Sequence, residues 1–188
     1  MVRAAATSRT GTAGRRPGVT QHNRAVYAVL PTPIGDLTLV GDGRALRGLY
    51  FPDHARRPGI ETFGHRDDLA FPDARRQLAE YFAGERTTFD LPLATQGNEF
   101  QRSVWRLLGT IPYGRTRSYG QLAADLGDPG LARAVGAANG RNPISIVVPC
   151  HRVVGHDGAL TGYAGGLARK AFLLQLEQPE GARPPTLF

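Results

Sequence analysis

The stretch ISIVVPCHRV, residues 144–153, is the part of the sequence around which the rest is organised. Its β-branched and apolar residues predict a buried strand, and this strand has to stop at Pro149. Cys150, the only cysteine of the chain, and His151 follow directly. We therefore expect a bent, exposed strand end that holds a thiol beside a potential base.

Two interpretations of Cys150 compete. A free cysteine is often a small buried apolar residue, and adjacent side chains of an extended strand point to opposite faces. On the other hand, His151 and Arg152 favour the thiolate electrostatically, and the thiolate is the nucleophilic form. Glu177, near the end of the last apolar helix pattern, can orient a histidine and complete a series of nucleophile, base and orienting carboxylate.

The composition limits the class of protein. The chain has 188 residues, of which 41% are hydrophobic, and this is enough for a core in one domain or two small ones. No stretch approaches the roughly 18–20 apolar residues of a membrane span. A single cysteine excludes an internal disulfide framework and a cysteine-built zinc site, and it fits a reducing, cytoplasmic compartment.

The formal net charge of +7 is unevenly distributed. Residues 1–24 contain five arginines, no acidic residue and no apolar core of a signal peptide, so we predict a flexible basic extension. Residues 96–178 contain nine basic and five acidic side chains, whereas residues 25–95 contain eight and ten. This pattern suits a polyanionic partner. The alternative is a solvated surface from an arginine-rich genome, because Lys170 is the only lysine.

Residues 25–95 predict an antiparallel meander followed by a helix. Turn-forming clusters separate three short apolar runs, at 26–30, 37–40 and 46–51. Residues 52–68 are polar and interrupted by proline and glycine, which predicts a long loop. Asp73 is the expected N-cap of the following helix, which ends near Gly84.

The composition changes near Gln96, after which the chain is predicted to be mostly helical. Two capping-box patterns, Asn98 with Gln101 and Ser118 with Gln121, start two helices. In the first of them, Trp105 is expected to serve packing. The second helix, a break and a third helix over 131–138 form a helix-turn-helix pattern, although any helical hairpin gives the same signal.

The third helix is almost bare, since it consists of alanine and glycine apart from Leu131, Arg133 and Val135. Such a helix can approach another surface closely, with Arg133 near its N-terminal end. The alternative is a small-residue helix packed in the core, with Arg133 reaching solvent. A glycine-rich loop at 155–166 and a last helix over 167–177 complete this half.

These motifs resemble those of a known family. PCHRV at 149–153, preceded by NGRNP at 139–143, is similar to the active-site signature of the O6-alkylguanine-DNA alkyltransferases, also called methylated-DNA–protein-cysteine methyltransferases. The resemblance is dense over residues 96–178 and looser over residues 25–95. It also includes Ser118-Tyr119, ARAVG at 132–136, YAGGL at 163–167, TPIG at 32–35 and YFAG at 81–84.

The resemblance implies an α/β (α+β) fold with two domains. Residues 25–95 would form a ribonuclease-H-like antiparallel sheet plus helix, and residues 96–178 a mostly helical, winged-helix or helix-turn-helix-like DNA-binding domain, followed by a tail at 179–188. The implied function is DNA repair by single-turnover transfer of the alkyl group of O6-alkylguanine to Cys150. O4-alkylthymine is a further candidate substrate. The base would first be flipped from the duplex through the minor groove.

The resemblance also implies catalytic roles. Cys150 would accept the alkyl group, His151 would act as its base through a bridging water, and Glu177 would orient His151. Tyr119 would donate a proton to the guanine ring as the base leaves. The backbone carbonyls of Cys150 and Val153 would accept from the exocyclic amine of guanine.

Further residues are implied in DNA binding and in the substrate pocket. Arg133 would fill the gap left by the extruded nucleotide, and Asn142 would tie the recognition helix to the active-site strand. The DNA-facing helix region also includes Ala132, Ala134, Gly136 and Ser118. The pocket would be completed by Pro149, Val153, Tyr163, Ala164 and Gly165. Ala164 stands where family members carry serine. Recognition of the guanine oxygen survives if that contact runs through the backbone N–H, and it is weakened if the contact runs through a hydroxyl.

We expect no cofactor and no metal, because the zinc-binding cysteines of some relatives are absent and only His22, His54 and His65 occupy the first half. The expected partner of a monomer is double-stranded DNA that contains O6-alkylguanine, with no membrane. Three alternatives remain: a non-catalytic lesion sensor, which would lack Cys150, a helix-turn-helix regulator, and a cysteine hydrolase, which would turn over repeatedly.

Overall fold

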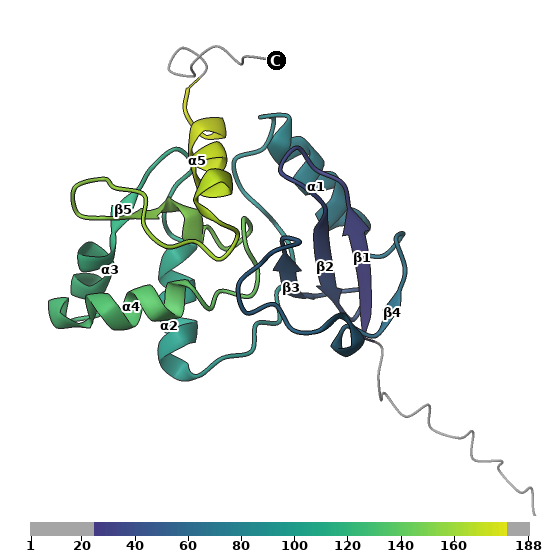
Figure 1. Ribbon diagram of the computed structural model, residues 1–188, viewed down its shortest axis with the longest axis horizontal. Helices are drawn as coiled ribbons and strands as arrows, with labels where there is room; N and C mark the ends of the chain where they lie inside the picture. Colours follow the sequence, from purple (N-terminus) through teal and green to yellow (C-terminus); the bar gives the residue numbers. More distant parts are fainter. Residues whose placement is uncertain (1–24, 180–188) are drawn as a thin grey trace, which may run out of the picture.

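The structure, a computed structural model, describes residues 25–179 (Figure 1). An N-terminal sheet and helix are followed by a mostly helical C-terminal part, so the predicted mixed α/β fold is confirmed. The basic extension expected at 1–24 and the tail from residue 180 onward lie outside the described residues.

The predicted meander is present and forms the core of the N-terminal part. Strands β1 (Val26–Leu30), β2 (Leu37–Gly41) and β3 (Leu46–Tyr50) pair in antiparallel order. The pairing register sets Ala28 opposite Leu39, and Leu39 opposite Leu49. All three side chains are fully buried, so this row of cross-strand neighbours is the centre of the sheet's packing.

The long loop predicted at 52–68 contains regular structure that the sequence pattern did not indicate. It includes a 3-10 turn, η1 (Ile60–Thr62), and a two-residue strand, β4 (His65–Arg66), which runs parallel to β1. The amide of Asp67 donates to the Tyr27 carbonyl at 2.8 Å. Both residues of β4 are exposed, so backbone pairing at the free edge of β1 forms this strand and no hydrophobic alternation marks it.

Helix α1 (Pro72–Phe82) begins differently from the prediction. Its N-cap is Phe71, in the left-handed region with φ 58°, and Pro72 takes the first helical position. Asp73 therefore lies inside the first turn, where its charge favours the helix dipole, and the prediction of Asp73 as N-cap is wrong. The buried Phe71 ring packs in the core, so tertiary packing outweighs the better capping residue. Gly84 follows the helix end with φ 78°, as expected.

Both predicted capping boxes are confirmed in the C-terminal part. Helix α2 (Glu99–Leu108) starts at Asn98, whose side chain accepts from the Gln101 amide at 2.9 Å. Helix α3 (Tyr119–Asp125) starts at Ser118 in the same manner. Trp105 is buried, and its indole nitrogen donates to the Ala138 carbonyl at 3.0 Å, which confirms its packing role.

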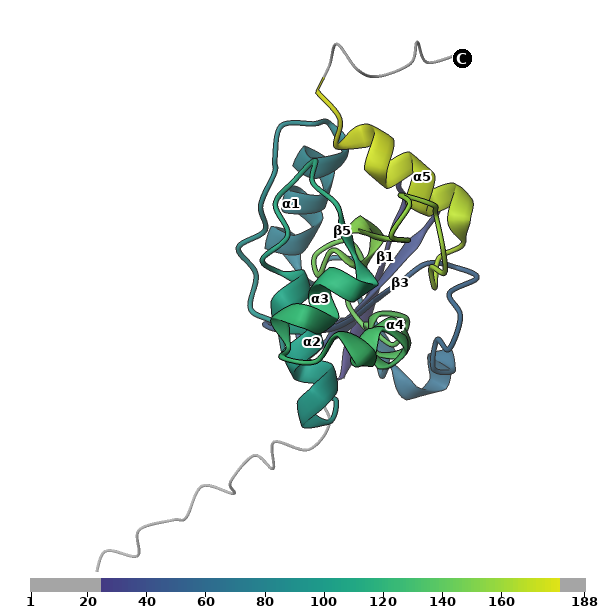
Figure 2. The same ribbon diagram turned by 90° about the vertical axis from the view of Figure 1, so that its left-hand side faces the viewer.

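Helix α3, the 3-10 turn η2 (Pro129–Leu131) and helix α4 (Ala132–Asn139) form the predicted helical pair. Figure 2 looks at the end of the molecule where α3 and α4 lie together beside α2. One side of α4 is buried through Val135 and Ala138, whereas Arg133 is exposed. The helix is thus packed on one face and open on the other.

The buried strand predicted at 144–148 is not present. Ile144 makes only an isolated bridge to Leu49, residues 145–147 form a turn, and Cys150 opens the 3-10 turn η3 (Cys150–Arg152). Ile146, fully buried, has a φ of 71°, which is rare for a β-branched residue. The apolar side chains are explained by the core through which this segment passes, because burial selects such residues in a turn as well as in a strand.

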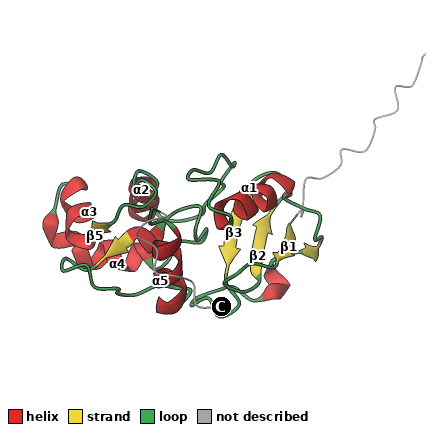
Figure 3. Cartoon of the chain, turned by 90° about the horizontal axis from the view of Figure 1, so that it is seen from above, coloured by secondary structure: helices red, strands yellow, loops and turns green. Residues whose placement is uncertain are grey.

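The segment from Pro143 to Cys150 also joins the two parts of the molecule, which lie side by side in Figure 3. The Leu49 amide in β3 donates to the Pro143 carbonyl at 2.8 Å, and the Ser145 amide donates back to Leu49 at 3.3 Å. Strand β5 (Arg117–Ser118) pairs with β6 (Val153–Val154), directly after η3, and helix α5 (Leu167–Leu176) closes the fold. The sheet therefore supports the segment that carries Cys150.

Replacement of Asn98 by alanine should lower the free energy of unfolding by about 1 kcal/mol, because the α2 capping box loses its side-chain acceptor. Urea unfolding followed by circular dichroism would measure the change. Ser103→Ala in the same helix is the control and should change stability by less than about 0.5 kcal/mol. Equal effects of the two variants would contradict the capping role.

Candidate active site

Cys150 lies inside the protein, where it follows Pro149 as the first residue of η3. Its side chain is 3% exposed, and the Asn142 amide donates to its sulfur at 3.1 Å. Burial raises the pKa of the Cys150 thiol, while the hydrogen bond from Asn142 and the charge of Lys170 oppose this rise in part. The prediction of an exposed strand end is therefore wrong, and the free protein holds a protonated, enclosed thiol.

The amide of Asn142 holds the turn that presents this thiol. Its Nδ2 donates to the Val148 carbonyl at 2.8 Å, and its Oδ1 accepts from the Ile144 amide at 3.1 Å. The side chain of Asn139, the last residue of α4, donates to the Cys150 carbonyl at 3.4 Å. The link from α4 to Cys150 thus comes from Asn139 and Asn142 together, whereas the sequence indicated Asn142 alone.

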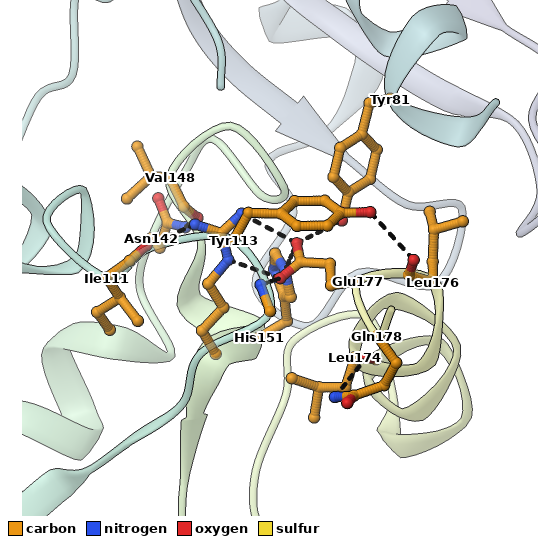
Figure 4. Close-up of polar contacts among 12 residues, drawn as sticks. Tyr81, Ile111, Tyr113, Asn142, Val148, His151, Leu174, Leu176, Glu177 and Gln178 are labelled. Carbon is orange, nitrogen blue, oxygen red and sulfur yellow. Dashed lines mark hydrogen bonds and ion pairs between the residues drawn. The ribbon is translucent and has the colours of Figure 1, made fainter. Parts of the chain in front are cut away.

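His151 and Arg152 both bind Glu177, and Figure 4 shows His151 beside the Glu177 carboxylate. Nε2 of His151 is 2.9 Å from Oε1 of Glu177, and the Arg152 guanidinium contacts both carboxylate oxygens at 2.9 Å. The expected pairing of His151 with Glu177 is present. The expectation that Arg152 favours the thiolate does not hold, because its charge is paired with Glu177.

Two further groups from elsewhere in the chain donate hydrogen bonds to the Glu177 carboxylate. The Tyr81 hydroxyl of α1 donates to Oε1 at 2.8 Å, and the Gly114 amide donates to Oε2 at 3.1 Å. Burial by itself raises the pKa of Glu177, but the hydrogen bonds from His151 and Arg152 outweigh it and hold the pKa at about 2. Glu177 is therefore a fully ionised acceptor at neutral pH.

This carboxylate decides the tautomer of His151. Burial lowers the pKa of His151, and Glu177 opposes that shift. An ionised carboxylate only accepts hydrogen bonds, so the neutral ring carries its proton on Nε2. Nδ1 is then the basic nitrogen, and it is buried with no hydrogen-bond partner among the described residues. Nδ1 of His151 is thereby the ring nitrogen that is able to accept a proton.

Lys170 is a buried residue of the site that no sequence motif indicated. Its Nζ donates to the carbonyls of Val153 at 2.5 Å and Thr161 at 2.6 Å, and burial lowers its pKa to about 8. The Val153 carbonyl, expected to accept from guanine, thus already has one donor. The available signal was the position of the only lysine within an apolar helix pattern.

The residues expected to face DNA lie on α3 and α4. The Tyr119 hydroxyl is 3.4 Å from the Thr161 carbonyl of the glycine-rich loop. A β-carbon added to Gly136 would lie 3.6 Å from the Tyr119 ring, so a small residue here keeps α4 close to Tyr119. Ser118 caps α3, and Ala132 and Ala134 are half-buried beside the exposed Arg133.

The expected pocket wall, Tyr163 to Gly165, rests on the N-terminal part. A β-carbon on Gly165 would lie 2.4 Å from the Phe51 ring, and the Ala164 carbonyl accepts from the Ala55 amide at 2.8 Å. The Tyr163 hydroxyl is buried with no partner among the described residues. Only glycine fits at 165 without moving Phe51.

No group of three or more potential metal ligands occurs among residues 25–179. His54 stacks on Phe51, and burial lowers its pKa to about 4, while His65 is exposed in β4 and His22 lies outside the described part. No helix within the described range is long and apolar enough to cross a membrane.

Comparison with known proteins identifies the family of this chain. The model of the 6-O-methylguanine DNA methyltransferase DNA-binding domain matches residues 99–179, and that of the ribonuclease-like domain of the same proteins matches residues 25–95. The chain belongs to the 6-O-methylguanine DNA methyltransferase family. The family resemblance inferred from the sequence is thus confirmed.

The similarity to individual members of the 6-O-methylguanine DNA methyltransferase family is high. The methylated-DNA–protein-cysteine methyltransferase of Mycolicibacterium paratuberculosis is 54% identical over 162 residues, which are 86% of this chain and 98% of the relative. That of Methanosarcina acetivorans is 50% identical over 151 residues, covering 80% and 97%. The crystal structure of Mycobacterium tuberculosis OGT in complex with DNA matches with a TM-score of 0.77 and 53% identity, covering 81% and 92%.

Replacement of Glu177 by glutamine should lower the free energy of unfolding by about 3–5 kcal/mol, because the Arg152 charge would stay buried without a counter-ion. Thermal and urea unfolding would measure the loss. The control is Glu80→Gln, which removes the more exposed pairs with Arg76 and Arg86 and should change stability far less, because exposed ion pairs contribute little. A similarly small loss in both variants would contradict the structural importance of Glu177.

Proposed function

We propose that this protein repairs DNA by moving the alkyl group of O6-alkylguanine to its own Cys150, once per molecule. Membership of the methyltransferase family supports DNA alkyl repair. The observation that carries the assignment to Cys150 is the adjacent His151, whose basic Nδ1 is set by the Glu177 carboxylate. The relative whose structure was solved with DNA supports a DNA partner.

The proposed reaction is a displacement at carbon. The Cys150 sulfur forms a bond to the alkyl carbon while the bond from that carbon to guanine O6 breaks, and its electron pair goes to the guanine ring. The thiol proton passes to Nδ1 of His151 through a bridging water, and Tyr119 donates a proton to the leaving guanine. The product is a thioether, which no described group of the site can reverse, so we propose a single turnover.

The raised pKa of the Cys150 thiol explains why the reaction would need His151 as a base. A buried thiol ionises with difficulty, so the proton must be removed as the new bond forms. The ion pair of Glu177 with a protonated His151 would stabilise the transition state, in which the thiol proton has moved to His151. Cys150, His151 and Glu177 would then act as nucleophile, base and orienting carboxylate. The Asn142 amide and the Lys170 charge support the developing thiolate.

DNA recognition in this proposal requires the base to leave the duplex, because its alkyl carbon is enclosed there. The open, small-residue face of α4 suits the narrow minor groove, and Arg133 would occupy the gap in the base stack. Tyr119 would exchange its contact with Thr161 for the guanine ring. Residues 96–178 would form the catalytic and DNA-binding unit, residues 25–95 its support, and the protein would act on DNA in the cytoplasm.

Incubation with a DNA duplex that contains O6-methylguanine should add one methyl group per protein, on the peptide that contains Cys150. Intact and peptide mass spectrometry would measure the transfer, and Cys150→Ser should bind the same DNA without gaining a methyl group. Binding without modification of the native protein would favour a lesion sensor. Release of methylated product over many turnovers would contradict the single-turnover mechanism.

Arg133→Ala should slow repair of duplex DNA by at least about tenfold. Flipping a base costs a few kcal/mol, and without Arg133 no side chain would fill the gap in the base stack and offset this cost. Its reaction with free O6-benzylguanine, which needs no flipping, should change by less than about twofold. Arg44→Ala, which removes the same charge from an exposed site in the N-terminal part, is the control. Equal losses on both substrates would rule out a flipping role for Arg133.

A further inference from the structure

Tyr81 contacts the candidate catalytic network from outside the C-terminal part. It belongs to α1, and its hydroxyl donates to Oε1 of Glu177 at 2.8 Å across 96 positions of sequence. Both side chains are buried, Tyr81 fully. Figure 4 shows Tyr81 and His151 on different sides of the Glu177 carboxylate. The N-terminal part thus touches the group that orients the proposed base.

The ring of Tyr81 is held in place by its neighbours, and its hydroxyl stays protonated. Its ring packs against the rings of Phe82 and Phe89, each with a centroid separation of 5.4 Å, and against Tyr113 at 6.1 Å. Burial, together with the negative charge of Glu177, raises the pKa of Tyr81 well above its usual value. The hydroxyl therefore keeps its proton and remains a permanent donor to the carboxylate.

The same carboxylate oxygen binds His151, so the two contacts are coupled. Among the described residues, Oε1 accepts from Tyr81, His151 and Arg152. Each donor draws negative charge toward itself and limits the directions from which the others approach. A change in the donor strength of Tyr81 must therefore alter both the orientation of His151 and its affinity for a proton.

We propose that Tyr81 is a positioning residue of the alkyl-transfer reaction, through which the N-terminal part orients Glu177 and limits how strongly Glu177 holds a proton on His151. This inference rests on the proposed function, because it assigns His151 the role of base. Tyr81 does not touch Cys150 in any described hydrogen bond and acts only through the carboxylate.

The sign of the effect follows from the charges. Without the Tyr81 donor, more of the carboxylate charge acts on His151, so the pKa of His151 rises and the base is blocked by protonation at a higher pH. The groups that face the pair from all packed elements stay in place: Arg152 and Cys150 of η3, Lys170 of α5, and Tyr113 with the Gly114 amide from the loop after α2.

Tyr81→Phe should lower the plateau rate of methyl transfer by about five- to twentyfold, because Glu177 is less well oriented. It should also move the acidic limb of the pH–rate profile upward by about half a pH unit. The profile would be measured for transfer from O6-methylguanine DNA and for alkylation of Cys150 by iodoacetamide, which needs no DNA. A loss of stability alone would not move the limb.

Tyr113→Phe is the matched control, since the described hydrogen bond of the Tyr113 hydroxyl goes to the Leu176 carbonyl, at 3.0 Å and at the same helix end. It should leave the plateau rate within about twofold and the acidic limb unchanged. If Tyr81→Phe does not fold, site-specific 3-fluorotyrosine at position 81 retains the ring and donates more strongly, and it should move the limb downward.

The possible results separate the two proposals. A native protein that reacts with iodoacetamide but never accepts methyl from DNA would overturn the proposed function, whereas the iodoacetamide profile would still test Tyr81. A native protein that accepts methyl, with a Tyr81→Phe profile that coincides with it in rate and in acidic limb, would overturn the role of Tyr81. An unshifted limb in the fluorotyrosine protein would do the same.

Discussion

The carboxylate of Glu177 is the group on which the rest of the site depends. Within residues 25–179 its two oxygens accept hydrogen bonds from Tyr81, Gly114, His151 and Arg152, and the side chain is 1% exposed. A buried charge is tolerated only when such donors compensate its lost hydration. The residue at the end of α5 thereby ties together α1, the loop after α2 and the turn that carries Cys150.

Glu177 also fixes the tautomer of His151, the residue that follows Cys150 in the chain. A charged acceptor on one side of the ring leaves the basic nitrogen on the other, so Glu177 sets the basic nitrogen without contacting the sulfur itself. The thiol itself is buried, and burial raises its pKa, so few thiolates exist in the resting protein. Because the thiolate is the reactive form, enclosure also slows unwanted reactions with soluble electrophiles and oxidants.

The two parts of the chain cooperate at this site. The sheet supports the active-site turn through Leu49, the segment after β3 holds the Tyr163–Gly165 loop through Phe51 and Ala55, and α1 supplies Tyr81. Helix α4 of the C-terminal part buries one face in the protein. Its other face, which consists of small residues and the exposed Arg133, remains accessible. The N-terminal part thus supports the site, and α4 offers a face on which Arg133 stands among small residues.

The sequence by itself determined the local elements and the family. The three strands, both capping boxes and the packing role of Trp105 were predicted, because local hydrogen bonding and hydrophobic alternation are encoded within short segments. The pairing of His151 with Glu177, 26 positions apart, followed from the family resemblance. Only the tertiary structure decided that residues 144–148 form a buried turn, that the thiol is enclosed, and that Phe71 rather than Asp73 caps α1. It also decided that Lys170 and Tyr81 belong to the site. The physical reason is that burial and long-range contacts set these features, and a run of apolar residues indicates that a segment is buried without showing its backbone path or its distant partners.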